Sequence, residues 1–148
     1  MRKNNTKEEA VAIAHRSSVT GKVSELTAAM ALINVGWEVT LPVVDEVYDL
    51  VGKDPVNGEF YRFQVKTIRK RTDRDGTWYV INGVRGNGRN YTDDEIDYML
   101  GVDAETGDVY MTECRNLSEY WQRPGGDGAK YRWVKLTAEK EAGELMTH

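Results

Sequence analysis

Phe60-Tyr-Arg-Phe-Gln-Val-Lys66 alternates apolar and polar residues and is the most informative stretch of this 148-residue sequence. Such alternation is typical of a half-buried β-strand, because successive side chains of a strand point to opposite faces of the sheet. The apolar set is Tyr61, Phe63 and Val65, and the polar set is Arg62, Gln64 and Lys66. We therefore expect one face to pack in the core, while the other holds an amide and an ammonium group side by side.

A second strand is predicted just upstream, over residues 47–51, in which Asp49 faces away from its two neighbours. The connection between the two strands ends in Asn57-Gly58, a strong turn signal, so we expect an antiparallel hairpin. In such a hairpin Asp49 lies across from residues 62–64. A carboxylate, an amide oxygen and a lysine then converge at one end of the hairpin, and oxygen ligands of this kind suit a hard divalent cation.

Further upstream, a helix is predicted over residues 21–35, because apolar residues recur at intervals of three and four. The expected buried positions are Leu26, Ala29, Met30 and Ile33, with Ala28, Ala31 and Leu32 filling the other side of a largely buried helix. Glu25 is a candidate second carboxylate for a metal, because an unpaired acid among apolar neighbours would be costly. The alternative is an exposed acid at a helix start, where the helix dipole favours negative charge. Ordinary solvent-exposed positions are likewise the alternative for Asp49 and Lys66.

The remaining segments predict a single α+β or α/β domain over residues 1–148. Thr6-Lys-Glu-Glu9 is a capping box that predicts a first helix over residues 7–16, which Ser17-Ser-Val-Thr-Gly21 interrupts. Further strands are expected at residues 37–41, 77–81, 96–100, 108–112 and 131–136, with a short helix at 117–121 and a polar tail at the end. This order predicts a buried helix packed on one face of a mixed sheet.

Composition excludes several classes of protein. Hydrophobic residues make up 40% and charged residues 30%, as in globular proteins. No apolar run approaches the roughly 20 residues of a membrane helix, so we expect no membrane partner. With no signal-peptide pattern and one cysteine, we expect a cytoplasmic location and no disulfide framework. Thr20-Gly21-Lys22 lacks the upstream glycine of a phosphate-binding loop, so no nucleotide cofactor is expected.

The net charge of −4 conceals a basic segment. Residues 52–90 carry nine Lys and Arg against four acids, while both flanking segments are acidic. A local positive region can contact phosphates even when the whole chain is acidic. The other interpretation is a solvated basic loop.

Four segments in this order resemble the PD-(D/E)XK nuclease superfamily: Gly21-Lys-Val-Ser-Glu25, Gly36-Trp-Glu-Val39, Tyr48-Asp-Leu50 and Phe63-Gln-Val-Lys-Thr67. The resemblance is closest to archaeal Holliday-junction resolvases and to the homing endonucleases that carry Gln-x-Lys. Residues 91–98 and 109–111 extend it downstream, so it covers about residues 20–113. It implies a restriction-endonuclease-like core, a mixed β-sheet flanked by helices, with residues 114–148 as a C-terminal extension.

The resemblance also implies roles for individual residues. Glu25 and Asp49 would ligate Mg²⁺, for which Mn²⁺ can substitute. Gln64 would offer its side-chain oxygen, and the backbone carbonyl of Val65 would join it. Lys66 would orient or activate the attacking water and stabilise charge on the scissile phosphate. Gln64 stands where the family usually has an acid, which removes one negative charge and should weaken metal binding.

DNA is the partner that the resemblance implies, with phosphate contacts expected from Lys22, Arg62, Arg69, Lys70, Arg71, Arg74, Arg85 and Arg89. The first hypothesis is a Mg²⁺-dependent, structure-selective endonuclease of the Holliday-junction-resolvase type. Such an enzyme would act as a homodimer, because two symmetric nicks need two sites, and a tetramer is the alternative assembly. Other hypotheses are a sequence-specific homing or restriction endonuclease, a non-catalytic DNA-binding protein, and an unrelated small α+β protein with a chance motif.

Overall fold

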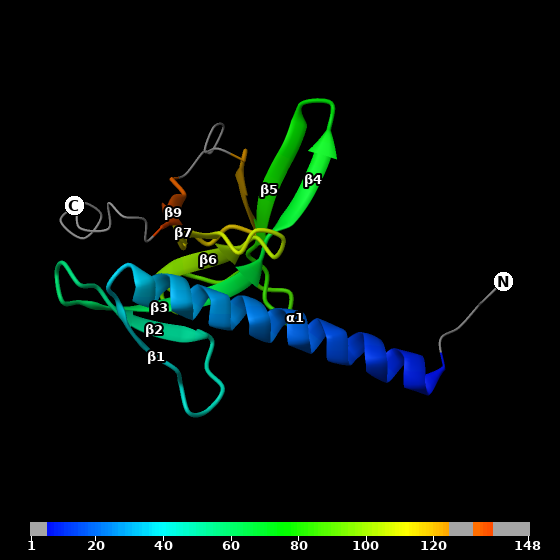
Figure 1. Ribbon diagram of the computed structural model, residues 1–148, viewed down its shortest axis with the longest axis horizontal. Coiled ribbons are helices and arrows are strands. Elements are labelled where there is room, and N and C mark those ends of the chain that lie inside the picture. The colour runs from blue at the N-terminus through cyan, green and yellow to red at the C-terminus, as the bar shows by residue number, and fades with distance from the viewer. Residues whose placement is uncertain (1–5, 125–131, 138–148) are drawn as a thin grey trace.

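The computed structural model describes residues 6–124 and 132–137, which form one helix and two β-sheets (Figure 1). The elements are α1 (Lys7–Asn34), β1 (Glu38–Thr40), β2 (Leu50–Lys53), β3 (Phe60–Thr67), β4 (Arg69–Asp73), β5 (Gly76–Asn82), β6 (Tyr98–Val102), β7 (Val109–Glu113), β8 (Glu119–Gln122) and β9 (Val134–Leu136). The larger sheet has the order β1-β2-β3-β6-β7-β9, and the smaller one β4-β5-β8. The β3–β6 pair is parallel and its neighbours are antiparallel, so the predicted mixed sheet is confirmed.

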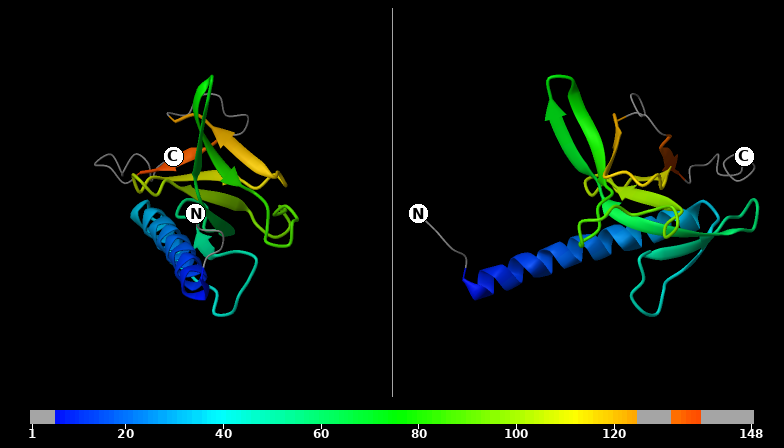
Figure 2. Two further views of the ribbon diagram at one scale, coloured as in Figure 1. Left: turned by 90° about the vertical axis from the view of Figure 1, so that its right-hand side faces the viewer. Right: turned by 180° about the vertical axis from the view of Figure 1, so that it is seen from behind.

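The larger sheet separates two hydrophobic cores. On one face Leu50, Phe63 and Leu100 pack against Ala28 and Leu32 of α1. On the other face the core joins β6 to the smaller sheet, and its buried residues include Ile68, Ile81, Met99, Tyr110 and Tyr120. The chain thus forms three layers: α1, the six-stranded sheet and the three-stranded sheet, whose β4–β5 hairpin extends away from the helix (Figures 1 and 2).

The prediction of two helices is wrong, because α1 is continuous from Lys7 to Asn34. Its capping box is as predicted: Glu9 N–H donates to Thr6 Oγ1 at 3.0 Å, and Glu9 Oε1 accepts from Thr6 N–H at 2.7 Å. The small polar residues at 17–21 do not break the helix. Thr20 donates its hydroxyl to the carbonyl of Arg16 one turn back, at 3.0 Å, which satisfies its side chain inside the helix. None of the described residues form a helix long and apolar enough to cross a membrane.

The prediction of a largely buried helix is wrong, although Ala28 and Leu32 are buried as expected. Ser24, Ala28 and Leu32 are the buried positions. Leu26, Met30 and Ile33 are 50–63% exposed. The sheet selects the face with small side chains, because Ser and Ala allow the helix to approach the strands closely, and the larger aliphatic residues point outward. The helix is therefore not largely buried, and its first half runs past the edge of the sheet (Figure 2).

The two predicted hairpins are confirmed, with Leu50 opposite Phe63 and Leu100 opposite Met111. The predicted short helix at 117–121 is wrong: this segment contributes to β8, which pairs with β5. The strand expected at 131–136 is present as β9 over Val134–Leu136, while residue 131 and the predicted tail from 138 lie outside the described residues. Strand β4 was not predicted, because all five of its residues are exposed and show no apolar alternation.

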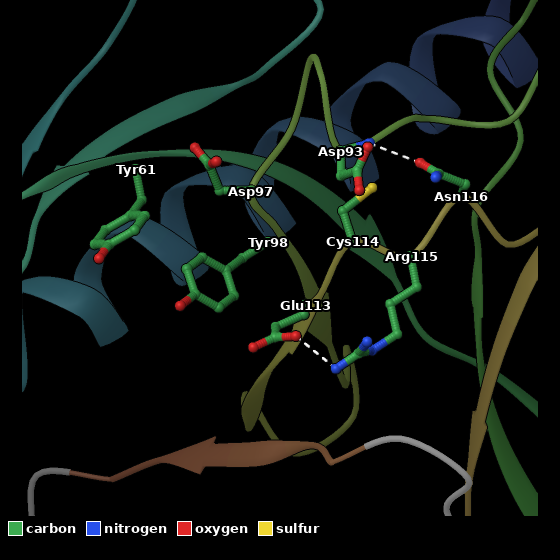
Figure 3. Close-up of a pocket in the computed structure, with 8 residues that line it drawn as sticks. All are labelled: Tyr61, Asp93, Asp97, Tyr98, Glu113, Cys114, Arg115 and Asn116. Atoms are coloured by element: carbon green, nitrogen blue, oxygen red, sulfur yellow. Dashed lines mark hydrogen bonds and ion pairs between the residues drawn. The ribbon is translucent and has the colours of Figure 1, made fainter.

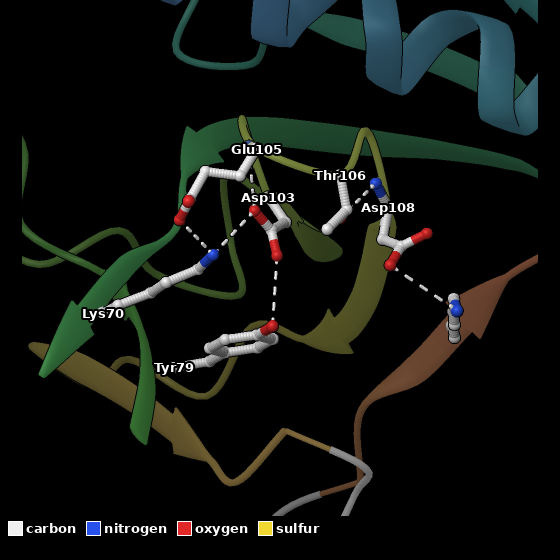
Figure 4. Close-up of polar contacts among 7 residues, drawn as sticks. Lys70, Tyr79, Asp103, Glu105, Thr106 and Asp108 are labelled. Carbon is white, nitrogen blue, oxygen red and sulfur yellow. Dashed lines mark hydrogen bonds and ion pairs between the residues drawn. The ribbon is translucent and has the colours of Figure 1, made fainter. Parts of the chain in front are cut away.

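A buried carboxylate joins the two sheets. Asp103, 1% exposed, follows β6 and binds the Lys70 ammonium at 3.1 Å and the Tyr79 hydroxyl at 3.1 Å (Figure 4). Lys70 also binds Glu105 at 2.5 Å. Burial tends to raise the pKa of Asp103, but Lys70, the Glu105 N–H and Tyr79 together hold that pKa below its usual value. The charged form of Asp103 is thus part of the fold, and it anchors the β4–β5 hairpin.

Candidate functional site

Asp49 is held against the middle of β3. It immediately precedes β2, and its N–H donates to the Phe63 carbonyl at 2.8 Å. Its carboxylate Oδ2 accepts from the Val65 N–H at 3.0 Å. The hairpin register thus places Asp49 beside residues 63–65, in agreement with the sequence-based prediction.

Burial shifts the pKa values of two groups at this site. Burial raises the pKa of Asp49, and the negative charge of Glu25 raises it further, against the lowering effect of the Val65 N–H and of Lys66. Burial lowers the pKa of Lys66, while the charge of Asp49 opposes that change. The carboxylate and the ammonium are therefore close enough to stabilise each other in a partly desolvated environment.

Glu25 reaches the same end of β3 from α1. The Ser24 and Thr67 hydroxyls are 2.6 Å apart and fix this turn of the helix to the end of the strand. The Glu25 side chain is 21% exposed and pairs with Lys22 at 3.0 Å. Glu25 is thus neither an unpaired buried acid nor a fully exposed one. Its charge acts on Asp49 across the helix–sheet boundary.

Gln64 adds a side-chain amide oxygen to the groups that could bind a metal ion. It is buried (7% exposed), and its Nε2 donates a long hydrogen bond of 3.4 Å to the Val65 carbonyl. That carbonyl oxygen has two lone pairs, so it can accept a further partner. The described residues contain no cluster of three or more His, Cys, Asp or Glu suited to a metal. Two carboxylates with an amide and a carbonyl oxygen nevertheless fit Mg²⁺, which usually binds one or two carboxylates and completes its shell with water and phosphate.

Tyr91 belongs to the site and was not predicted as part of it. The Lys66 ammonium lies 5.2 Å from the centre of the Tyr91 ring, within cation–π range. Burial raises the pKa of the Tyr91 phenol, and the charge of Asp49 adds to that effect. Tyr91 is buried, with 8% of its surface exposed. It comes from the loop before β6, whose position relative to β3 no local pattern predicts.

The predicted phosphate-binding residues come from four parts of the chain: α1, β3, β4 with the turn after it, and the loop between β5 and β6. Most are paired with acids: Lys22 with Glu25, Arg62 with Asp97, Arg69 with Glu119, Lys70 with Asp103 and Glu105, and Arg85 with Glu95. Arg62 also donates to the carbonyl of Asp94 at 2.7 Å, so its contacts hold the loop before β6 against β3. Arg74 and Arg89 are exposed.

Arg71 belongs to a second group, on one face of the smaller sheet. Its guanidinium lies 4.9 Å from the ring centre of Trp121, and Arg123 lies 4.2 Å from that of Trp78. The two tryptophan rings meet edge to face at 5.8 Å. Sequence analysis did not identify Trp121 or Arg123, because their pairing with Arg71 and Trp78 depends on the strand order β4-β5-β8. We call Arg71, Trp78, Trp121 and Arg123 the arginine–tryptophan face.

A polar pocket of about 560 Å³ lies beside Tyr61, near the start of β3, and Lys66 is not part of its lining (Figure 3). It is lined by Asp93, Asp97 and Glu113 among others. The cation in its lining, Arg115, is paired with Glu113 at 2.5 Å. Three carboxylates around one paired arginine repel phosphate, so this pocket does not suit a nucleic acid.

Two acids, an amide and a desolvated lysine at one strand end have the chemistry that phosphodiester cleavage needs, which is the reaction of a nuclease. The chain belongs to the PD-(D/E)XK endonuclease family, whose model matches residues 15–122. The predicted superfamily is therefore confirmed. A comparison with curated protein sequences gives no significant match.

The fold is similar to that of a bacterial homing endonuclease, I-Ssp6803I, with a TM-score of 0.59. The two chains are 24% identical, and the match covers 87% of this chain and 91% of the other. At this level of identity the likeness establishes a shared fold, so the predicted restriction-endonuclease-like fold class is confirmed as well.

Proposed function

We propose that this protein is a Mg²⁺-dependent endonuclease that hydrolyses phosphodiester bonds of DNA. The observation that carries the proposal is the convergence of Asp49, Gln64 and Lys66 at one end of β3, with Glu25 brought there by α1. Membership of the PD-(D/E)XK endonuclease family, whose model matches residues 15–122, also supports it.

The residues divide the work of hydrolysis among them. Glu25, Asp49, Gln64 and the Val65 carbonyl would hold the ion, which supplies Lewis acidity and a more acidic bound water. Lys66 orients the attacking water and donates to the phosphate oxygen on which negative charge develops. Tyr91 keeps the Lys66 ammonium in place through its ring. The bound ion would also lower the pKa of Asp49, which burial and Glu25 raise in its absence.

The arginine–tryptophan face is proposed as the contact surface for the DNA duplex. An arginine guanidinium can donate two parallel hydrogen bonds to one phosphate group. β4, on which Arg71 lies, follows β3 after a single residue, so a duplex on this face would stand close to the metal-binding residues. Arg62 and Lys70 are not proposed as DNA contacts, because Arg62 binds Asp97 and the Asp94 carbonyl, and Lys70 binds the buried Asp103.

A homodimer is proposed on the outer face of α1. Val19, Val23, Leu26, Met30 and Ile33 are 46–63% exposed and recur at alternating intervals of four and three residues. This is the heptad spacing by which two helices of the same sequence pack together. Light scattering should give twice the chain mass at micromolar concentration, and Leu26→Glu with Met30→Glu should give the single-chain mass. A mass of four chains would instead indicate a tetramer, which needs a second interface besides the one on α1.

Two substrate preferences are compatible with this site. The resemblance to junction resolvases supports cleavage of branched DNA, and the similarity in fold to a homing endonuclease supports cleavage of a specific duplex sequence. Gln64, which carries no charge, is the reason to keep a non-catalytic DNA-binding protein as a third candidate.

The test compares a labelled four-way junction with a linear duplex of the same arms and with a library of random-sequence duplexes. Wild type and Lys66→Ala are incubated with Mg²⁺ or with EDTA. Paired symmetric nicks on the junction alone support a resolvase, and recurrent cuts at one library sequence support a homing or restriction enzyme. In both cases EDTA and Lys66→Ala must abolish the cuts. Binding without any cut in Mg²⁺ or Mn²⁺ would overturn the proposal in favour of the non-catalytic protein.

A further inference from the structure

A groove of about 730 Å³ separates the N-terminal half of α1 from the end of β3. The helix packs on one face of the larger sheet and continues beyond the sheet toward its N-terminus (Figures 1 and 2). Arg16, Ser17 and Thr20 line the groove from the helix, and Lys66 and Thr67 line it from the strand. The groove therefore opens directly onto the site that contains the candidate catalytic lysine.

The lining of this groove is basic and rich in hydroxyl groups. Its residues include two cations, Arg16 and Lys66, and no acid. Arg16 differs from the paired basic residues described above, because within residues 6–124 and 132–137 its guanidinium forms no ion pair. An exposed guanidinium with no acid in the same lining, one residue from the Ser17 hydroxyl, is suited to a phosphate group.

We propose that this groove binds the DNA strand beside the scissile phosphate, with the Arg16 guanidinium on one of its phosphate groups. Arg16 lies nine residues before Glu25, which corresponds to about 13 Å along the helix axis at 1.5 Å per residue. A single strand of duplex DNA advances 3.4 Å per phosphate along its axis. The bound phosphate is therefore within about four nucleotides of the cut. Ser17 adds a hydroxyl donor from the same turn of the helix.

The helix is held firmly enough to position this contact. The Ser24–Thr67 hydrogen bond of 2.6 Å joins α1 to the end of β3 at the floor of the groove. Arg16 lies two turns toward the N-terminus from that bond, on the same continuous helix. Arg16 is therefore a positioning and affinity residue, which sets where the strand lies, while Lys66 acts on the reacting phosphate.

This inference rests on the proposed endonuclease function, and its test uses the substrate whose cut site the preceding experiment maps. Arg16→Ala should weaken binding of that substrate about tenfold, measured by fluorescence anisotropy with Ca²⁺ in place of Mg²⁺, and should reduce the salt slope by about 1. The single-turnover rate at saturation should stay within about threefold of wild type. Arg16→Lys should recover part of the affinity.

His15→Ala is the matched control, because His15 neighbours Arg16 on the helix but lines a different hollow with Lys7 and Val11. It should bind as wild type does. A scan with single neutral methylphosphonates around the cut locates the contact: at one position within about four nucleotides, the substitution should weaken wild type and leave Arg16→Ala unaffected.

Three outcomes would overturn the inference. In the first, Arg16→Ala binds DNA as tightly as wild type, and in the second, its loss of affinity adds to that of every methylphosphonate. Either result means that the groove does not bind the strand. The endonuclease function would still stand if wild type cuts the DNA and Lys66→Ala does not. If wild type cuts no DNA, the function and this inference fail together.

Discussion

The end of β3 and the neighbouring strand β4 both carry basic residues, but the surroundings of these residues differ: Lys66 at the end of β3 is partly desolvated, whereas the cations of β4 are exposed and have partners. Lys66 is partly buried and has a lowered pKa, and it faces an acid whose pKa is raised. On β4, Arg69 and Lys70 are paired with carboxylates, and Arg71 lies on a tryptophan ring. Desolvated charges at a strand end are costly for the fold and useful for chemistry, whereas satisfied surface charges support the fold or bind a ligand. Substitutions in the two regions should therefore affect different measurements.

The largest effect is expected from Lys66→Ala. It should lower the single-turnover cleavage rate about 10²–10⁴-fold, because it removes the group that assists proton transfer and stabilises developing charge. Residual cleavage within tenfold of wild type, at full substrate saturation, would place the catalytic lysine elsewhere.

Asp103→Ala should act on stability instead of chemistry. It leaves the Lys70 ammonium and the Tyr79 hydroxyl without their shared acceptor, and we expect a loss of about 2 kcal/mol in the free energy of unfolding, measured with urea. The cleavage rate of the folded fraction should be unchanged. A stability equal to that of wild type would show that the cluster does not anchor the β4–β5 hairpin.

Arg71→Ala should weaken DNA binding about fivefold and reduce the salt slope by about 1, because one phosphate contact is lost. The rate at saturation should stay as in wild type. Thr72→Ala, the next residue on the exposed strand, is the matched control and should change neither quantity. Equal effects of both variants on affinity would remove the arginine–tryptophan face as a duplex-binding surface.

The smallest effect is expected from Gln64→Glu, on the affinity of the site for Mg²⁺. Gln64→Glu adds a negative charge among the oxygen donors, so Mg²⁺ should bind a few-fold more tightly, as measured by calorimetry. Added acid near Lys66 should also raise the pKa of its ammonium toward the usual value. Weaker Mg²⁺ binding in this variant would mean that residue 64 does not face the ion.

Local patterns predicted the parts of the fold that depend on neighbours in sequence. The alternation in β3 and the Asn57-Gly58 turn sufficed for the β2–β3 hairpin, and with it for the contact between Asp49 and β3. The membership of the PD-(D/E)XK family was predictable because its motif lies on these same elements.

What could not be predicted depends on contacts between distant segments. The buried face of α1 follows from how closely the sheet approaches Ser24 and Ala28, which periodicity alone does not show. β4 is a strand because β5 pairs with it, since its own residues are all exposed. Tyr91 reaches Lys66 through a loop, and Arg16 reaches the groove because the helix is continuous through residues 17–21.

The central claim is that Asp49 is a metal ligand, and metal binding by wild type and Asp49→Asn tests it without a DNA substrate. Burial and Glu25 raise the pKa of Asp49 above 3.8, so the charged carboxylate disfavours the metal-free fold, and this penalty grows as the pH rises from 3.8 through the raised pKa. Asp49→Asn keeps an oxygen for the Val65 N–H and should melt at the same or a higher temperature than wild type near pH 7. Adding Mg²⁺ or Mn²⁺ should raise the melting temperature of wild type and leave that of Asp49→Asn unchanged, because an ion stabilises only a fold that binds it. Equal shifts in the two proteins would contradict the assignment of the metal site to the end of β3.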